Sequence, residues 1–213
     1  DIRSRIDIQQ GTLRGFPPSA ICCHVSASPN HQSLRKSGLD DRFGPAAFGV
    51  LGYELNILKM NENEMDAIKK QISFYKAHRR TFQYGRFRHL PSFDKDCIFW
   101  SIEGDDEIIV MEYQDRNGVN IGRHHRLIIP FADENMSYRI ERREKYISPE
   151  DLGELDESYS KVQHKPFSII VSGSVLKKAG IALPNTFMGR GFDENTRLML
   201  DNSSDLFVIT PID

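Results

Sequence analysis

The chain has 213 residues, of which 39% are hydrophobic and 27% charged, the composition of an ordinary globular protein with one large or two small domains. Its formal net charge of −2 gives no reason to expect nucleic acid or an acidic membrane surface as a partner. The sequence contains no apolar run of the length that a membrane-spanning helix needs.

The first part of the chain alternates predicted helices and strands. A short helix over residues 1–10 should end near Gly11, and the apolar run within residues 19–26 has the length of a buried strand. A helix of small residues is expected around residues 45–50, followed by a strand over residues 51–57. This order is typical of parallel βα units, which need further strands and helices to cover their edges and faces.

A long amphipathic helix is predicted from about Glu62 to Gln83. Asn61 and Glu64 have the spacing of a capping box, and Gly85 is a natural end. The acidic residues 62–64 are therefore interpreted as a helix start rather than a catalytic pair. The predicted apolar stripe consists of Met65, Ile68, Ile72, Tyr75 and Phe82.

After Gly85 the sequence changes to short strand-like runs separated by turn residues such as 104–106 and 117–118. Strands at this spacing predict an antiparallel β-sandwich. The fold class is therefore α/β followed by all-β, with a domain boundary near residues 86–91. The predicted strands cover residues 97–102, 107–113, 125–129, 138–141, 167–172 and 206–210.

The three cysteines do not form a disulfide framework and favour a reducing compartment. Cys22 and Cys23 are interpreted as core residues of a strand, because a zinc site needs four ligands and no paired spacing elsewhere supplies them. His124 and His125 are adjacent on a predicted strand and should point to opposite faces, so they are interpreted as surface residues. No metal site is expected.

A polar segment over residues 24–32 is the candidate binding site. It follows a predicted parallel strand, and in α/β barrels binding groups lie at the carboxyl ends of strands. The candidate substrate-binding residues are His24, Ser26, Asn30 and His31, whose side chains donate and accept hydrogen bonds as sugar recognition requires. The alternative interpretation is an ordinary polar βα loop with a structural histidine.

The same segment, HVSASPNHQ, resembles the HVSAVPNHQ segment of bacterial α-galactosidases of glycoside hydrolase family 36. Four further stretches are similar to motifs of that family and occur in the same order. They are FGVLGYELN (48–56), IKKQISFYK (68–76), QYGRF (83–87), and SGSVL with AGIALP (172–176 and 179–184). The resemblance is densest over residues 8–87.

The resemblance implies a (β/α)₈ barrel with a β-sandwich tail and a retaining mechanism with two carboxylates. Residues 1–87 would then be the last part of the barrel, and residues 88–213 the sandwich domain. The family's nucleophile motif KWDxN does not occur in the chain. Asp1 aligns with the second aspartate of the SDxTD motif, so the acid/base is expected three residues upstream of Asp1. A second register would make Asp1 the acid itself.

The resemblance predicts an α-galactosidase acting on raffinose and melibiose, in the cytoplasm, without a cofactor and as a homo-oligomer. The residues 1–213 alone are expected to be inactive without the two carboxylates. A galactosyl transferase of the same fold is a second possibility. The third is a non-catalytic carbohydrate-binding or assembly module. The chain has a single tryptophan, Trp100, which argues against an aromatic sugar-binding platform on the sandwich domain.

Overall fold

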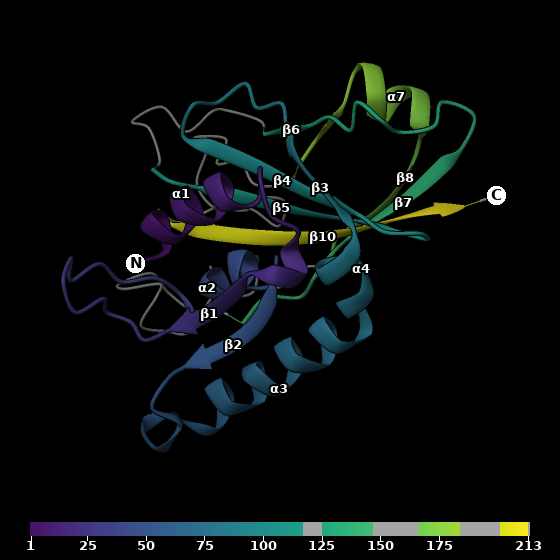
Figure 1. Cartoon of the computed structure of the whole chain (residues 1–213). Helices are drawn as coiled ribbons and strands as arrows, with labels where there is room; N and C mark the ends of the chain where they lie inside the picture. The colour runs from purple at the N-terminus through teal and green to yellow at the C-terminus, as the bar shows by residue number, and fades with distance from the viewer. Residues whose placement is uncertain (117–124, 147–165, 184–200, 213) are drawn as a thin grey trace, which may run out of the picture.

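A computed structural model describes residues 1–116, 125–146, 166–183 and 201–212. Within these ranges, the helices are all too short or too polar to cross a lipid bilayer. The chain forms a two-stranded parallel sheet with its helices, a six-stranded antiparallel sheet, and a small two-stranded sheet that covers part of the large one (Figure 1).

The amino-terminal part contains two parallel strands in register, with Cys22 opposite Val50 and Ser26 opposite Glu54. The Asp1 side chain caps the first helix by accepting a hydrogen bond from the Ser4 backbone NH. The elements are α1 (Ile2–Thr12), the 3₁₀ helix η1 (Pro18–Ala20), β1 (Cys22–Ser26), α2 (Leu39–Ala46), β2 (Val50–Glu54) and the 3₁₀ helix η2 (Ile57–Lys59).

The predicted long helix is two helices, α3 (Glu62–Ala77) and α4 (Arg79–Tyr84), which meet at His78. The capping box of Asn61 and Glu64 is present as predicted. The prediction of one continuous helix was wrong because His78 leaves the helical conformation, with φ −106° and ψ 12°. Its Nδ1 hydrogen-bonds Glu107 Oε2 at 2.8 Å, a contact between residues far apart in the sequence.

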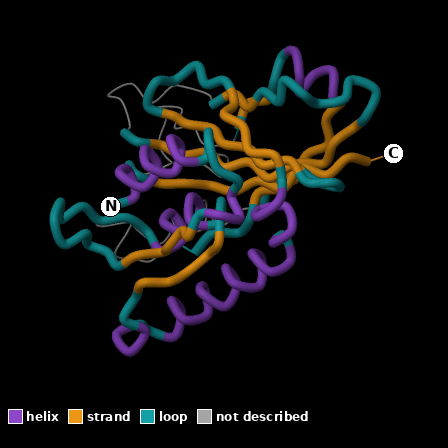
Figure 2. Tube along the Cα trace, viewed as in Figure 1, coloured by secondary structure: helices purple, strands orange, loops and turns teal. Residues whose placement is uncertain are grey.

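The large sheet has the strand order β3-β4-β5-β10-β7-β8, and every neighbouring pair is antiparallel. Figure 2 draws the strands in orange. Two short strands, β6 (Arg126–Leu127) and β9 (Ile181–Ala182), form the small sheet, and α7 (Gly173–Lys178) lies before β9 in the chain. The strands of the large sheet are β3 (Arg86–Leu90), β4 (Cys97–Glu103), β5 (Ile108–Gln114), β7 (Ser137–Arg142), β8 (Ser168–Ser172) and β10 (Ser203–Ile212).

The central strands β4 and β5 are buried on both faces of the large sheet, and their side chains alternate between two apolar cores. On β5, Met111 and Tyr113 point toward the helices and belong to a core that also contains Phe48 and Phe82. We call this side the helix face. The opposite side, which we call the outer face, holds a second apolar core that includes Val110 and residues of β6, β9 and α7.

The amino-terminal part and the large sheet share the helix-face core. Helix α2 packs against both β1 and β10, which places it between the two sheets (Figure 1). The indole of Trp100 on β4 lies 5.7 Å from the Phe48 ring, centroid to centroid, in an edge-to-face arrangement. Trp100 is fully buried in this core and presents no sugar-binding platform.

The predicted strands of the large sheet are confirmed, although the run 125–129 contains only the two residues of β6. The helix expected at residues 45–50 was misplaced, because α2 begins at Leu39 with Asp40 and Asp41 in its first turn and ends at Ala46. The expected turn at residues 117–118 lies outside the described residues. Strand β3 joins the sheet from Arg86 onward, but the division of the chain into domains at 87 and 88 stays a prediction.

Candidate functional site

The carboxyl ends of β1 and β2 lie side by side and bring together polar groups from separate parts of the chain. The strands end at Ser26 and Glu54, which are opposite each other in the register. The loop of residues 27–38 follows β1, and the start of α1 lies next to it (Figure 1). Side chains that contact each other here therefore come from α1, β1, the loop and β2, as expected at the carboxyl edge of a parallel sheet.

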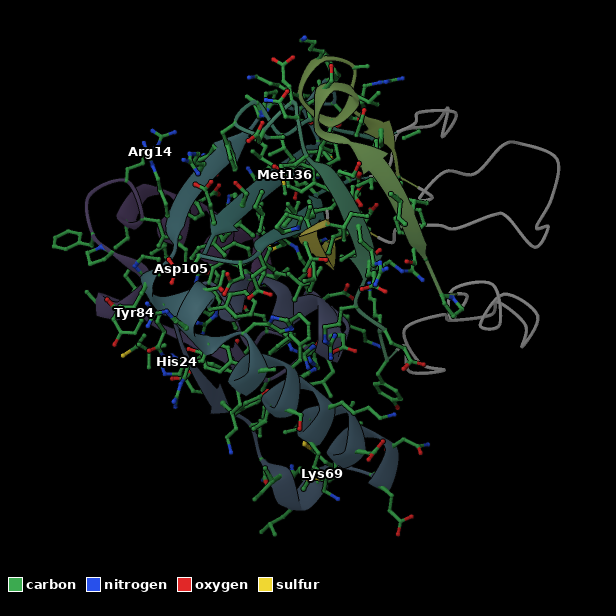
Figure 3. The ribbon with its side chains drawn as sticks, turned by 90° about the vertical axis from the view of Figure 1, so that its right-hand side faces the viewer. Arg14, His24, Lys69, Tyr84, Asp105 and Met136 are labelled. Atoms are coloured by element: carbon green, nitrogen blue, oxygen red, sulfur yellow. The ribbon has the colours of Figure 1, made fainter. Side chains whose placement is uncertain are left out.

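His24 is half-buried, and its imidazole faces the carboxylate of Glu54. The distance from His24 Nδ1 to Glu54 Oε1 is 3.8 Å, and Arg5 Nη2 lies 3.2 Å from Glu54 Oε2. The imidazole passes over Gly52 on β2, where an added Cβ would lie 2.5 Å from His24 Cδ2. The glycine thus makes room for the histidine ring, which lies near the periphery of the molecule in Figure 3.

Asp1 ties the loop to the start of α1. Arg35 Nη1 donates to both carboxylate oxygens of Asp1, at 2.8 and 2.9 Å, and Ser33 Oγ donates to Asp1 Oδ2 at 2.7 Å. With the Ser4 backbone NH, these donors occupy both oxygens of the Asp1 side chain. A carboxylate held in this way is suited to fixing the loop, because charge-assisted hydrogen bonds are strong and directional.

Asn30 holds the loop in a tight turn. Its Oδ1 accepts hydrogen bonds from the Gln32 and Ser33 backbone NH groups, at 3.0 and 2.9 Å, and its own backbone NH donates to the Arg35 carbonyl at 3.0 Å. Leu34, at the end of this turn, has a φ of 55°. The side chain of Asn30 is thus engaged within the loop, and the turn leaves the neighbouring His31 exposed.

The four predicted site residues therefore have different surroundings. His24 and Ser26 lie on β1 at the edge formed with Glu54, Asn30 shapes the loop, and His31 is exposed on it. Three residues of this edge were not predicted from the sequence, namely Arg5, Glu54 and Arg35. Glu54 could have been found from its position at the end of a predicted strand, whereas the Asp1–Arg35 contact joins residues too far apart for sequence spacing to reveal.

The two adjacent cysteines have opposite environments. Cys23 is buried, and Gln9 Nε2 lies 2.6 Å from its Sγ. Burial raises the pKa of the Cys23 thiol to about 11, so this thiol is protonated near neutral pH. Cys22 is exposed, so its assignment to the core was wrong, because alternate residues of β1 face opposite sides.

A cavity of about 450 Å³ lies away from the strand ends, between α3 and residues 143–146. Charged groups of its wall pair with each other, Asp40 with Arg143 at 3.0 Å and Asp66 with Lys70 at 3.1 Å. None of its wall belongs to the strand ends or to residues 27–38. The lining residues are Asp40, Asn63, Asp66, Ala67, Lys70, Phe74, Arg143, Glu144, Lys145 and Tyr146.

Comparison with known sequences gives one family and a set of related enzymes. The Melibiase family matches residues 1–85. The α-galactosidase AgaA of Geobacillus stearothermophilus is 38% identical over 144 residues, which cover 66% of this chain and 20% of that protein. α-Galactosidase 1 of Pediococcus pentosaceus is 36% identical over 116 residues, which cover 53% of this chain and 16% of that protein.

Solved structures of such enzymes superpose on the whole chain. The α-galactosidase of Lactobacillus brevis has a TM-score of 0.74 at 31% identity, covering 100% of this chain and 25% of that one. A variant of the glycoside hydrolase family 36 enzyme AgaA in complex with raffinose has a TM-score of 0.73 at 31% identity, with the same coverage. Another AgaA variant was solved in complex with stachyose. The chain spans about a fifth to a quarter of the length of these relatives.

Proposed function

The chain matches a fragment of the glycoside hydrolase family 36 α-galactosidases, and we propose that the protein to which it belongs hydrolyses terminal α-galactosides such as raffinose and melibiose. The observation that carries this proposal is the superposition of the whole chain on α-galactosidases at about 31% identity. The raffinose and stachyose complexes of AgaA variants support the choice of substrate class.

The parallel strands β1 and β2 are proposed to be part of a (β/α)₈ barrel. Parallel sheets are normally covered on both faces, yet the residues of β2 are only half-buried or exposed. In the described part of the chain, β1 and β2 pair only with each other, which leaves an edge on each strand for a neighbour. Further barrel strands would cover these edges and complete the ring of strand ends around a substrate.

The proposed reaction is a double displacement with retention of configuration. Such a reaction uses one carboxylate as nucleophile and a second as acid and then base, about 5 Å apart. The proposed acid/base precedes Asp1 by three residues, and the nucleophile likewise lies outside residues 1–213. Because donors occupy both oxygens of the Asp1 carboxylate, we assign Asp1 the role of positioning residues 30–35.

The residues at the strand ends would contact the sugar. The imidazole of His24, the hydroxyl of Ser26 and the imidazole of His31 offer donors and acceptors for galactose hydroxyl groups. Asn30 would place His31 indirectly, by holding the turn that precedes Arg35. The site therefore combines a fixed strand edge with a loop that Asp1 and Arg35 hold in place.

The test is to incubate the intact protein with raffinose and with melibiose and to follow the products by proton NMR. The proposal predicts free galactose that appears first as the α-anomer, because retention preserves the configuration of the substrate. Galactose that appears first as the β-anomer would contradict the retaining mechanism. A folded protein that releases no galactose from either sugar would contradict the function, and transfer to a second sugar would indicate the transferase.

Two further properties of the whole protein belong to the proposal. A cytoplasmic location fits the three cysteines, which are all free thiols. A homo-oligomer fits the large apolar side chains on the surface, such as Leu58 and Phe93, which are 92% and 77% exposed. Light scattering of the intact protein after size-exclusion chromatography tests the oligomer, which a monomeric mass would rule out.

A further inference from the structure

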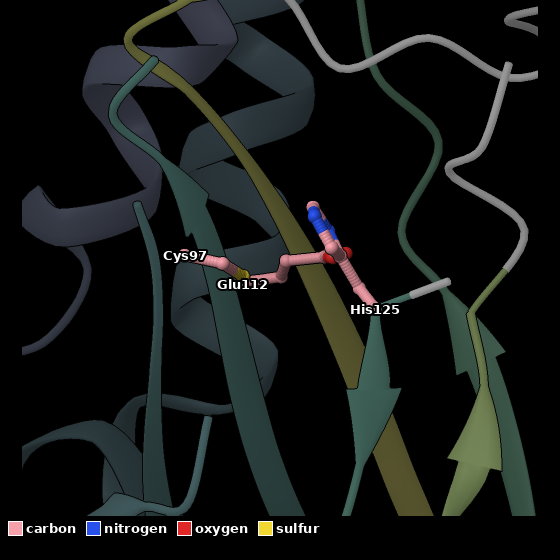
Figure 4. A group of neighbouring side chains, drawn as sticks. All are labelled: Cys97, Glu112 and His125. Atoms are coloured by element: carbon pink, nitrogen blue, oxygen red, sulfur yellow. The ribbon is translucent and has the colours of Figure 1, made fainter. Parts of the chain in front are cut away.

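A cluster of three possible metal ligands lies on the outer face of the large sheet. Cys97 is the first residue of β4, Glu112 lies on β5, and His125 directly precedes β6 (Figure 4). The ligand atoms of the three side chains lie within 4.8 Å of one another. His125 Nδ1 also forms a short hydrogen bond with Glu112 Oε1.

The strand register explains why these residues meet. Cys97 is opposite Gln114 and Phe99 is opposite Glu112, so Cys97 and Glu112 are diagonal neighbours on the outer face. Strand β6 lies over this face, and its residue Leu127 belongs to the core on the outer face. His125 thus approaches Glu112 from above the sheet, which corrects its interpretation as a surface residue.

The cluster is buried in a largely apolar layer. The exposed fractions are 3% for Cys97, 0% for Glu112 and 8% for His125. Glu112 is opposite a second buried carboxylate, Asp205, on β10. The charge of Asp205 is paired, with Arg142 and Lys145 each at 3.7 Å. A cation at the cluster would neutralise the charge of an ionised Glu112 carboxylate, whose burial is otherwise costly.

We propose that Cys97, Glu112 and His125 bind a zinc ion that stabilises the large sheet. Thiolate, imidazole and carboxylate are the three side-chain ligand types that zinc takes in proteins. With a thiolate, a carboxylate and a neutral imidazole, the zinc complex has a net charge of zero, which suits a buried site. This inference is independent of the proposed galactosidase activity.

Unpaired polar atoms in the same part of the sheet point to a missing ligand. Gln114 Oε1 and Ser203 Oγ are buried and make no hydrogen bond within the described part of the chain. Gln114 is the residue opposite Cys97, and Ser203 is opposite Gln114 on the next strand. Zinc in structural sites has four ligands, and a water molecule or Gln114 Oε1 would supply the fourth.

Binding of zinc requires that one proton leaves the cluster and that a second one changes its place. The Cys97 thiol would release its proton to solvent and bind through the thiolate. The neutral imidazole of His125 would carry its proton on Nε2 instead of Nδ1, so that Nδ1 and the Glu112 carboxylate each bind the zinc ion in place of the hydrogen bond between them.

The first experiment measures zinc bound to the intact protein, after dialysis against zinc and then against buffer. Cys97→Ser and His125→Gln are compared with Cys23→Ser, which alters a buried cysteine of a different sheet. The proposal predicts that the wild-type protein and Cys23→Ser hold one more equivalent of zinc per chain than the two cluster variants. Equal zinc in all four proteins would overturn it.

A second experiment needs no substitution in the cluster, so it remains decisive if the variants fail to fold. Cobalt replaces zinc, and a cobalt-bound thiolate absorbs in the near ultraviolet by charge transfer. Cys22→Ser and Cys23→Ser are introduced together, so that Cys97 is the only cysteine left in residues 1–213. The charge-transfer band should appear on addition of cobalt and disappear on addition of excess zinc. A folded protein without this band would overturn the proposal.

Discussion

The two main sheets of this chain differ in where they place their polar side chains. The parallel pair β1 and β2 is short and only partly buried, and its polar groups gather at the carboxyl ends of the strands. The six-stranded sheet is buried on both faces at its centre, where all seven residues of β5 are buried, including Glu112 and Gln114. Open strand ends suit the binding of a substrate, whereas strands that are buried on both faces suit stability.

The two regions are nevertheless joined by one core and one polar network. Phe48 and Trp100 pack together across the junction, and Asp40 on α2 hydrogen-bonds Arg143, which follows β7. The folding of the parallel pair should therefore depend on the large sheet. Substitutions at residues that connect the two regions should therefore lower stability more than substitutions elsewhere.

Trp100→Ala should have the largest effect, because it removes the largest fully buried side chain of the shared core. We expect the free energy of unfolding to fall by about 3–5 kcal/mol. Urea denaturation followed by circular dichroism measures the change. Tyr84→Ala, at a residue that is 73% exposed, is the matched control and should change stability by less than about 0.5 kcal/mol. Equal effects of the two substitutions would show that Trp100 does not join the regions.

Asp40→Ala should lower the free energy of unfolding by about 3 kcal/mol, because it leaves the buried guanidinium of Arg143 without its carboxylate. The Asp40 carboxylate also accepts a hydrogen bond from Gln71 Nε2 at 2.6 Å. Thermal unfolding by calorimetry measures the loss. Asp66→Ala, which removes an exposed ion pair with Lys70 on one helix, should cost about 0.5 kcal/mol or less. An equally small loss of stability in Asp40→Ala would contradict the proposal that this polar network joins the two regions.

Arg35→Met should reduce kcat/KM of the intact protein for raffinose about tenfold, which corresponds to roughly 1.4 kcal/mol of transition-state stabilisation. The substitution removes both hydrogen bonds to the Asp1 carboxylate and so loosens residues 30–35. Steady-state kinetics measure the change. Arg14→Met, at an exposed arginine after α1, is the control. Unchanged kinetics of the Arg35 variant would show that the position of residues 30–35 does not affect the reaction with raffinose.

Glu107→Gln should lower stability by about 1 kcal/mol near neutral pH, a modest effect because the carboxylate is partly exposed. Burial acts to raise the pKa of Glu107, but hydrogen bonds from His78 and Thr81 outweigh it and lower the pKa overall. A lowered pKa in the folded state gives a stabilisation that is complete above the unfolded pKa, about 4.3. This stabilisation is lost as the pH falls through the folded pKa of Glu107.

Urea denaturation of the wild-type protein and the Glu107 variant between pH 7 and pH 3 tests this sign. Below about pH 5, where the carboxylate itself titrates, the difference in stability should shrink as the pH falls. A difference that grows below pH 5 would show that the pKa of Glu107 is raised in the folded protein.

Local features of the fold were accessible from the sequence. The capping box of Asn61 and Glu64, the parallel order of β1 and β2, and five of the six strands of the large sheet follow from short-range patterns, whereas β3 was not predicted. The break at His78 was not accessible, because it accompanies a contact with Glu107 from another element. The helix α2 was predicted too late in the sequence, because the small residues around Pro45 were taken as the helix and its start at Leu39 was not recognised.

The candidate sites show the same limit. His24 and Ser26 could be predicted because a polar segment follows an apolar strand. The Asp1–Arg35 contact and the cluster of Cys97, Glu112 and His125 could not, since long-range packing and strand register bring these residues together. Ligand spacing along the sequence reveals metal sites on one helix or loop, but not sites assembled from three segments of a sheet.

Hydrogen–deuterium exchange of the intact protein, with and without raffinose, tests most directly whether the strand ends of the parallel pair face the sugar. We predict slower exchange in residues 27–38 and 54–60 when raffinose is bound, and unchanged exchange in β4, β5 and β10. Protection confined to the large sheet, or no protection at residues 27–38 while raffinose is bound, would contradict the account.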